Sequence, residues 1–201
     1  MFYSQFKQDE YLENTVFKGF KNGIFMDIGA HDGVTYNNTL FFEKTHGWTG
    51  FNVEPIRTVY EKLIGNRPAA VNIQCAVSSN DGVAEFLCNT GHTEMISGLK
   101  DSFDKRHFER LERENAQKGG TTEIIQVNTY RFETLCEMYN IRHIHYLSID
   151  VEGAEFDVIK SINFDKVFID VIGFENNYMD VTMPIIRYLH TKGYKLSLIH
   201  I

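Results

Sequence analysis

The stretch Phe25-Met26-Asp27-Ile28-Gly29-Ala30-His31-Asp32-Gly33 decides the fold of this chain. It is predicted to be a short apolar strand that ends on an acid and runs into a turn with two glycines, which can take positive φ and let a ligand approach the backbone closely. A second strand ends on Glu54, which lies 54 − 33 = 21 residues past the last glycine. An acid at about that distance accepts hydrogen bonds from ribose hydroxyls in nucleotide-binding α/β domains. The glycine turn and Glu54 together predict that an adenosine-containing cofactor binds across the first two strands.

The turn differs from the one that binds a dinucleotide. That turn has the pattern Gly-x-Gly-x-x-Gly, whereas His31 stands here in place of the middle glycine. Asp27 precedes the first glycine and Asp32 lies inside the turn. Two carboxylates would repel a pyrophosphate but attract the cationic sulfonium and amino groups of S-adenosyl-L-methionine. Asp-x-Gly-x-x-x-Gly resembles the first motif of class I methyltransferases. An ordinary strand-to-helix turn with two glycines stays open as an alternative.

Composition indicates one globular domain over residues 1–201, because 43% of the residues are hydrophobic and this length can bury a full core. The net charge of −7 argues against a nucleic-acid partner. Cys75, Cys88 and Cys136 fit neither a zinc site nor a disulfide framework, which favours a cytoplasmic location. We expect no membrane span, because no apolar run is long enough. The chain is either a whole protein or a domain excised from a larger one.

Strand and helix patterns alternate along the chain. This alternation predicts a Rossmann-like α/β fold, with a mostly parallel sheet and helices on both faces. The acids Asp27, Glu54, Asp150 and Glu175 then gather at the carboxyl edge of the sheet, where ligands bind. Predicted strands are 24–28, 51–53, 71–77, 83–88, 123–128, 144–149, 167–174 and 195–201, and predicted helices are 9–20, 36–46, 55–65, 101–118, 132–139, 155–162 and 181–192.

The run Asp150-Val151-Glu152-Gly153-Ala154-Glu155 places three carboxylates directly after a predicted strand. An acid at the start of a helix stabilises the helix dipole or caps its free N–H groups, and Glu155 is open to this purely structural interpretation. Asp150 ends an apolar strand, so it is expected at the ligand-binding edge.

Together these motifs resemble the FkbM family of S-adenosylmethionine-dependent methyltransferases. The resemblance rests on the glycine turn, on Glu54-Pro55, on the acidic run after residue 149 and on Glu175, and it extends from residue 3 to the last predicted strand. The opening Tyr3-Ser4-Gln5-Phe6-Lys7-Gln8-Asp9 is similar to that family's N-terminal segment. Family members commonly methylate hydroxyl groups, often on sugars of natural products or glycans. Similar domains are fused to glycosyltransferases, including in glycan-building proteins of large algal viruses.

The resemblance implies a class I methyltransferase fold, a sugar or glycan acceptor such as a deoxyhexose, and a partnership with glycosyltransferases. Residues 91–120 carry little of the family pattern, so we expect them to be an acceptor-specific insertion. The open alternatives are a non-sugar small molecule or lipid as acceptor, a nicotinamide-dependent oxidoreductase, and a binding module without activity. The cofactor-binding residues that the resemblance implies are Gln8, Asp27, Gly29, Ala30, His31, Gly33, Asn38, Thr39, Glu54, Pro55, Ala76 and Asp150.

A sugar hydroxyl is a weak acid, so its methylation needs a base, a metal ion or both. By analogy with other class I O-methyltransferases, Asp150 is expected beside the acceptor. With Glu175 and Asn176 it would form an oxygen-ligand site for Mg²⁺ or Mn²⁺. Alternatively, Asp150 or Glu152 acts as a base without a metal, with His31 as a further candidate because imidazole titrates near neutrality.

Overall fold

The computed structural model describes residues 1–103, 105–176 and 178–197. Its larger sheet has five strands in the order β3-β2-β1-β8-β9, and every neighbouring pair is parallel. The expected Rossmann-like α/β fold with a parallel sheet is therefore confirmed. The strands are β1 (Ile24–Ile28), β2 (Thr49–Val53), β3 (Val71–Ile73), β8 (His143–Ile149) and β9 (Phe168–Phe174).

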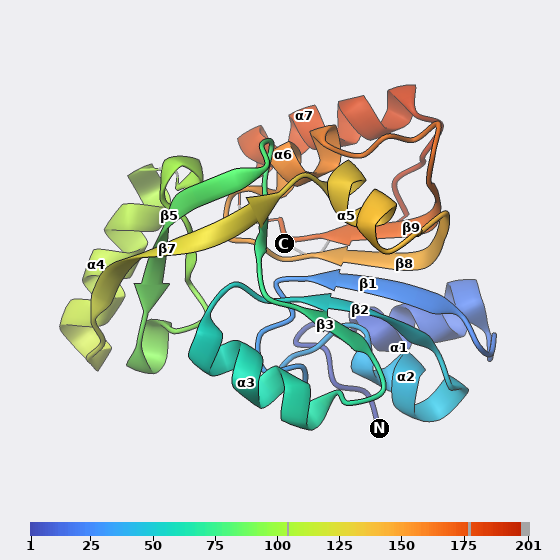
Figure 1. Cartoon of the computed structure of the whole chain (residues 1–201), viewed down its shortest axis with the longest axis horizontal. Coiled ribbons are helices and arrows are strands. Elements are labelled where there is room, and N and C mark those ends of the chain that lie inside the picture. Colours follow the sequence, from blue (N-terminus) through green and yellow to red (C-terminus); the bar gives the residue numbers. More distant parts are fainter. Residues whose placement is uncertain (104, 177, 198–201) are drawn as a thin grey trace.

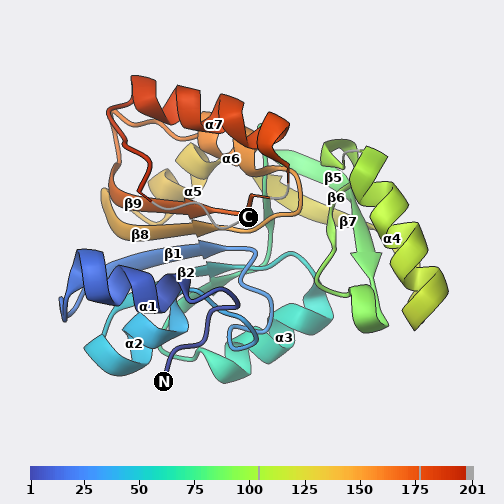
Figure 2. The same ribbon diagram turned by 180° about the vertical axis from the view of Figure 1, so that it is seen from behind.

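Helices cover both faces of this main sheet (Figure 1; Figure 2). One face packs an apolar core against α5 (Phe132–Met138), α6 (Glu155–Lys160) and α7 (Met179–Thr191). The other face packs against α1 (Gln8–Leu12) and α2 (Leu40–His46), around the buried rings of Phe25, Phe42 and Trp48. Within the described residues, no helix combines the length and the apolar character needed to cross a membrane.

A smaller sheet stands beyond the carboxyl ends of the main strands (Figure 1; Figure 2). Its order is β4-β7-β5-β6, and it mixes one parallel pairing with two antiparallel ones. The helix α4 packs Leu111 against Leu87 of this sheet, and α3 packs Val59 against its other core. The chain thus builds a second layer over the edge where a cofactor is expected. The elements are β4 (Ala76–Val77), β5 (Gly82–Asn89), β6 (Gly98–Leu99), β7 (Thr122–Tyr130), α3 (Arg57–Asn66) and α4 (Lys105–Lys118).

The prediction of a single strand over residues 71–77 is wrong. β3 ends at Ile73 in the main sheet, whereas β4 starts at Ala76 and pairs with β7 in the smaller sheet. Because the apolar pattern continues through both pieces, it does not reveal that the chain leaves one sheet for another.

Two predicted helices start four residues later than the pattern indicated. The helix predicted from residue 36 starts at Leu40, because the Asn37 side-chain oxygen accepts the backbone N–H groups of Thr39 (3.0 Å) and Leu40 (2.9 Å). The helix predicted from residue 101 starts at Lys105, after a short 3₁₀ turn. In both places local turns replace the first helical turn.

The two ends of the chain also differ from the predicted pattern. The helix predicted over residues 9–20 consists of α1 and a π-helical turn, Glu13–Phe17, and it stops at Lys18 with φ +47°. Of the strand predicted over 195–201, residues 195–197 have no regular structure, and residues 198–201 lie outside the described part of the chain.

Candidate active site

The glycine turn after β1 packs against the loop that follows β8. Gly29 has φ +84°, and a Cβ atom there would lie 1.8 Å from the carbonyl oxygen of Asp150. A Cβ atom on Gly33, which has φ +76°, would lie 2.6 Å from the side chains of Arg67 and Leu63. Glycine is therefore required at both positions by close contacts within the protein, whereas the sequence pattern had suggested close contact with a ligand.

Glu54 connects the end of β2 to this turn. It is buried, and its carboxylate accepts the backbone N–H groups of His31 (3.1 Å) and Ile56 (2.8 Å). Burial raises the pKa of Glu54 to about 7, although these two hydrogen bonds favour the charged form. A carboxylate oxygen accepts more than one hydrogen bond, so Glu54 can still accept from ribose hydroxyls.

Asp27 lies within β1 and not at its end. Its carboxylate is buried and accepts hydrogen bonds from Asn37 Nδ2 (2.8 Å) and Thr39 Oγ1 (3.0 Å). Burial raises the pKa of Asp27, and the nearby Arg67 guanidinium opposes this effect. Asp27 thus holds the start of α2 against β1, directly below the glycine turn.

Arg67 and Asn37 are the residues that the sequence pattern missed. Arg67 is fully buried, and it donates to Glu43 Oε2 (2.8 Å), the Gly33 carbonyl (3.1 Å) and Asn37 Oδ1 (3.0 Å). A buried guanidinium has no sequence signature, because its partners come from distant segments. Asn37 did carry a usable signal, since asparagine is common just before a helix.

Of four other predicted cofactor residues, two make hydrogen bonds within the protein. Gln8 opens α1 and accepts the N–H of Phe6 (3.0 Å), and Asn38 donates to Ser148 Oγ (3.1 Å). Pro55 follows Glu54 directly, whereas Ala76 is buried at the start of β4. Their roles toward a cofactor stay predictions.

The loop after β8 gathers carboxylates. Carboxylate oxygens of Asp150, Glu152 and Glu175 lie within 4.8 Å of one another. Partial loss of hydration next to the protein raises the pKa of Asp150, and repulsion from Glu152 raises it further. Solvent still reaches the Asp150 side chain, which screens part of the shift. Glu155 is structural, because it accepts the backbone N–H groups of Val151 (3.3 Å) and Gly153 (3.1 Å).

Two acids of the expected metal-binding set lie in this cluster, and the set itself stays a prediction. Asp150 and Glu175 come together as expected, and Glu152 is the third member. The side-chain oxygen of Asn176 accepts a hydrogen bond from Thr182 Oγ1 at 2.6 Å. Glu152, which was expected as a base, is the third acid of the cluster.

His31 belongs to the turn after β1. It has φ +51°, and its Nε2 lies 3.2 Å from Glu94 Oε1. Glu94 comes from the segment 91–120, so this segment contacts the predicted cofactor turn as well as the acid cluster.

The same segment covers the loop after β8. His107 of α4 is buried, and its Nε2 lies 3.2 Å from Glu152 Oε2. A Cβ atom on Gly98 would lie 3.3–3.4 Å from the carbonyl oxygens of Val151 and Glu152. Beside these contacts is a cavity of about 260 Å³, whose lining includes Ser102, Phe103, His107, Glu175, Tyr178 and Ile185.

A larger, open depression of about 870 Å³ lies at the C-terminal ends of α6 and α7, away from the acid cluster. We place the candidate site at the smaller cavity, because Glu175 lines it and belongs to the cluster.

The methyltransferase FkbM domain profile matches residues 27–196, a range that includes the glycine turn, Glu54 and the acid cluster. The chain belongs to the FkbM methyltransferase family. The expected family is therefore confirmed over most of the chain. Neither a curated protein nor a solved structure matches the sequence.

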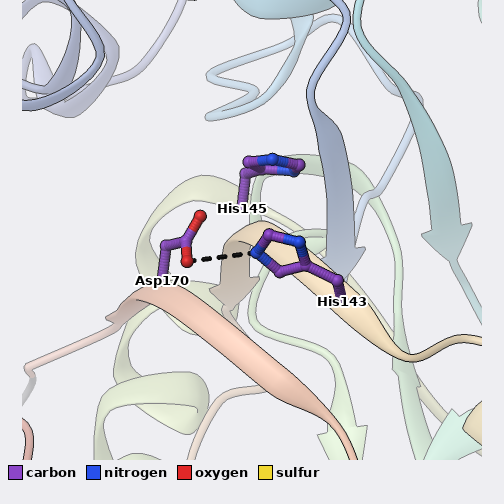
Figure 3. A group of neighbouring side chains, drawn as sticks. All are labelled: His143, His145 and Asp170. Carbon is purple, nitrogen blue, oxygen red and sulfur yellow. Dashed lines mark hydrogen bonds and ion pairs between the residues drawn. The ribbon is translucent and has the colours of Figure 1, made fainter.

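A second group of ligating side chains lies at the opposite end of β8 in this FkbM domain (Figure 3). His143 Nε2 lies 3.1 Å from Asp170 Oδ1 on β9. The Nδ1 atom of His145 accepts the backbone N–H of Ile24 at 2.9 Å, which leaves the proton of the neutral ring on Nε2. A metal ion would have to displace that proton, so this group is not arranged as a metal site.

Proposed function

We propose that this FkbM-family chain is an S-adenosyl-L-methionine-dependent O-methyltransferase that acts on a sugar hydroxyl of a glycan or glycoside, such as that of a deoxyhexose. The observation that carries the proposal is the acid cluster after β8, which lies against the glycine turn after β1. A cofactor on the turn and an acceptor at the cluster would be neighbours. The FkbM match favours methyl transfer over hydride transfer from a nicotinamide.

On the cofactor side, Glu54 is the ribose acceptor in this proposal. It is buried beside the N–H of His31, so a hydroxyl that donates to it exchanges water for a charge-assisted hydrogen bond. The acids near the turn favour a sulfonium over a pyrophosphate, because they would repel the latter.

On the acceptor side, Asp150 is the central catalytic carboxylate. Its raised pKa suits a base that works near neutral pH. In the transfer, the acceptor oxygen bonds to the methyl carbon as the carbon–sulfur bond breaks, and the hydroxyl proton moves to the carboxylate. S-adenosyl-L-methionine, when bound, would supply the methyl group and become S-adenosylhomocysteine, and the chain would gain rate by aligning the two reactants and removing the proton.

Residues 91–120 supply acceptor specificity in this proposal. The cavity of about 260 Å³ combines the carboxylate of Glu175 with the rings of Phe103 and Tyr178. Carboxylates accept hydrogen bonds from hydroxyls, and aromatic rings pack against the apolar face of a sugar. This combination favours a sugar over a lipid as the acceptor. A methylated sugar would suit a chain that works beside glycosyltransferases in the cytoplasm.

The first experiment compares thermal stabilisation by S-adenosylhomocysteine with stabilisation by NAD. A ligand at 100 times its dissociation constant stabilises the fold by about 2.7 kcal/mol, and we expect this shift only for S-adenosylhomocysteine. Methyl transfer is then screened on a panel of monosaccharide glycosides beside phenols and lipids. Stabilisation by NAD alone would refute the cofactor, and transfer only to a phenol or lipid would refute the sugar.

A further inference from the structure

We propose that Arg67 is a positioning residue for cofactor binding, which holds the turn after β1 in the shape that receives S-adenosyl-L-methionine. The inference deepens the proposed function, because it rests on a cofactor that binds at this turn. Arg67 directly follows α3, and its side chain is fully buried. Burial of a charged side chain costs free energy, which its partners in the turn and in α2 must offset.

The turn after β1 has a backbone that needs support from its neighbours. Gly29, His31, Gly33 and Tyr36 all have positive φ, between +51° and +84°. This conformation is uncommon for residues with side chains, as His31 and Tyr36 are. It persists where surrounding contacts fix it. The shape of the turn therefore depends on the side chains that hold it.

Two neighbouring residues at the end of α3 hold two successive carbonyl groups of this turn. Arg67 Nη1 donates to the Gly33 carbonyl at 3.1 Å, and Asn66 Nδ2 donates to the Asp32 carbonyl at 2.8 Å. A Cβ atom on Gly33 would lie 2.6 Å from Arg67 Cγ, so the stem of the arginine also packs against the turn. Arg67 thus fixes the turn both by a hydrogen bond and by direct packing.

Arg67 also orients the side chains between the turn and α2. Its Nη1 donates to Asn37 Oδ1 (3.0 Å) and its Nη2 donates to Thr39 Oγ1 (3.2 Å). Because a guanidinium only donates, it holds the Asn37 amide with Nδ2 toward Asp27, which accepts it at 2.8 Å. The Thr39 hydroxyl is likewise left to donate to Asp27 at 3.0 Å. One side chain therefore orients both donors to the buried acid of β1.

These contacts set the position of the turn relative to Glu54, the proposed ribose acceptor. Glu54 lies shortly before α3 and accepts the N–H of His31 at 3.1 Å. Arg67 lies directly after α3 and holds Gly33, further along the same turn. A cofactor that contacts both Glu54 and the turn needs them at a fixed separation. Glu54 and Arg67 are two fixed points of the turn, one from each end of α3.

The buried ion pair with Glu43 provides a matched control. Arg67 Nε and Nη2 both lie 2.8 Å from Glu43 Oε2 on α2. Glu43→Gln removes the ion pair but leaves Arg67 able to donate to Gly33 and Asn37. Arg67→Met alone would leave the Glu43 carboxylate unpaired, a change that can unfold the chain. The double variant Arg67→Met/Glu43→Gln removes both charges and avoids this defect.

The test is calorimetric titration of S-adenosylhomocysteine into each variant, with circular dichroism to confirm that the variant is folded. We expect affinity weaker by about 10- to 100-fold in Arg67→Met/Glu43→Gln, as for loss of a partner that orients a metal ligand. Arg67→Lys is the second variant, with the same expected loss, because it keeps the charge beside Glu43 but not the planar fork of donors. Glu43→Gln should bind like the wild type, whatever stability it loses. Wild-type affinity in Arg67→Lys or in the double variant, or an equal loss in Glu43→Gln, would overturn the positioning role.

Steady-state kinetics distinguish positioning from a merely structural role. In Arg67→Lys we expect KM for S-adenosyl-L-methionine to rise with the loss of affinity, while kcat stays within about threefold of the wild type. A structural defect that only removes active protein would lower kcat and leave KM unchanged, and that result would refute the positioning role. Absence of S-adenosylhomocysteine binding by the wild type would instead refute the proposed function, so the two failures are distinguishable.

Discussion

The two ends of β8 carry two clusters of ligating side chains that differ in how fully the protein satisfies them. At the amino end, His143 pairs with Asp170 (Figure 3). The backbone N–H of Ile24 donates to His145. At the carboxyl end, Asp150, Glu152 and Glu175 crowd together, and Glu152 Oε2 accepts no hydrogen bond within the described residues. One cluster is internally paired, whereas the other carries an excess of like charge.

This difference shows that closeness of ligating atoms does not by itself identify a functional site. A group whose donors and acceptors are already paired gains little from a ligand, because the ligand must displace those partners. A crowded group of like charges gains more from a cation, or from a substrate proton, because either one lowers the repulsion within the group. The carboxyl end of β8 also adjoins the glycine turn, so both arguments favour it as the place of the chemistry.

The largest expected effect is on the rate of methyl transfer, and it should distinguish the two ends of β8. Asp150→Asn keeps the side-chain shape and removes the charge, so we expect methyl transfer to fall by about 10²- to 10⁴-fold, as for loss of a general base. Asp170→Asn should leave the rate within about twofold of the wild type. Initial rates of methyl transfer measure both, and a rate for Asp150→Asn near that of the wild type would make His31 the leading catalytic candidate.

The sequence predicted the main sheet and its carboxyl edge well, for a physical reason. β1 and β8 are apolar runs that end at glycine turns or acids, and both signals are local. The smaller sheet could not be predicted, because β4 and β5 each pair with β7, which is more than 30 residues further along the chain. The Arg67 network depends on contacts between distant segments, so no local pattern encodes it.

A second prediction concerns pH and Glu54, the buried acid at the end of β2. Its pKa is about 7 in the folded chain and about 4.5 when unfolded, so the folded state holds the proton more tightly between these values. Stability therefore falls as pH rises from about 4.5 to 7, by up to about 3 kcal/mol, and stays low above this range. In Glu54→Gln this part of the decrease should disappear. Urea unfolding of both proteins across the pH range measures it, and parallel curves would contradict the pKa shift.

The same group should make cofactor binding depend on pH. Ribose hydroxyls donate to the charged carboxylate, so we expect S-adenosylhomocysteine affinity to rise as pH increases through about 7. The dependence should be absent in Glu54→Gln. An unchanged pH profile in that variant would assign the titration to another group.

The smallest expected effect is at the amino end of β8. The side chains of Asp170 and His143 are 33% and 41% exposed, so their ion pair is worth about 0–1 kcal/mol. We expect Asp170→Asn to change the free energy of unfolding by no more than this. A loss above about 2 kcal/mol in urea unfolding would show that the pair is part of the core.

We assign cofactor binding to the turn after β1 and the chemistry to the loop after β8. The most direct test of this assignment is the S-adenosylhomocysteine affinity of Glu54→Ala and Asp150→Asn, measured by calorimetry beside the wild type. Loss of a charge-assisted hydrogen bond worth about 1.5–3 kcal/mol predicts affinity that is weaker by roughly 10- to 150-fold in Glu54→Ala. In Asp150→Asn the affinity should stay within about threefold of the wild-type value. A larger loss in Asp150→Asn than in Glu54→Ala would contradict the assignment of the cofactor to the turn after β1 and of the chemistry to the loop after β8.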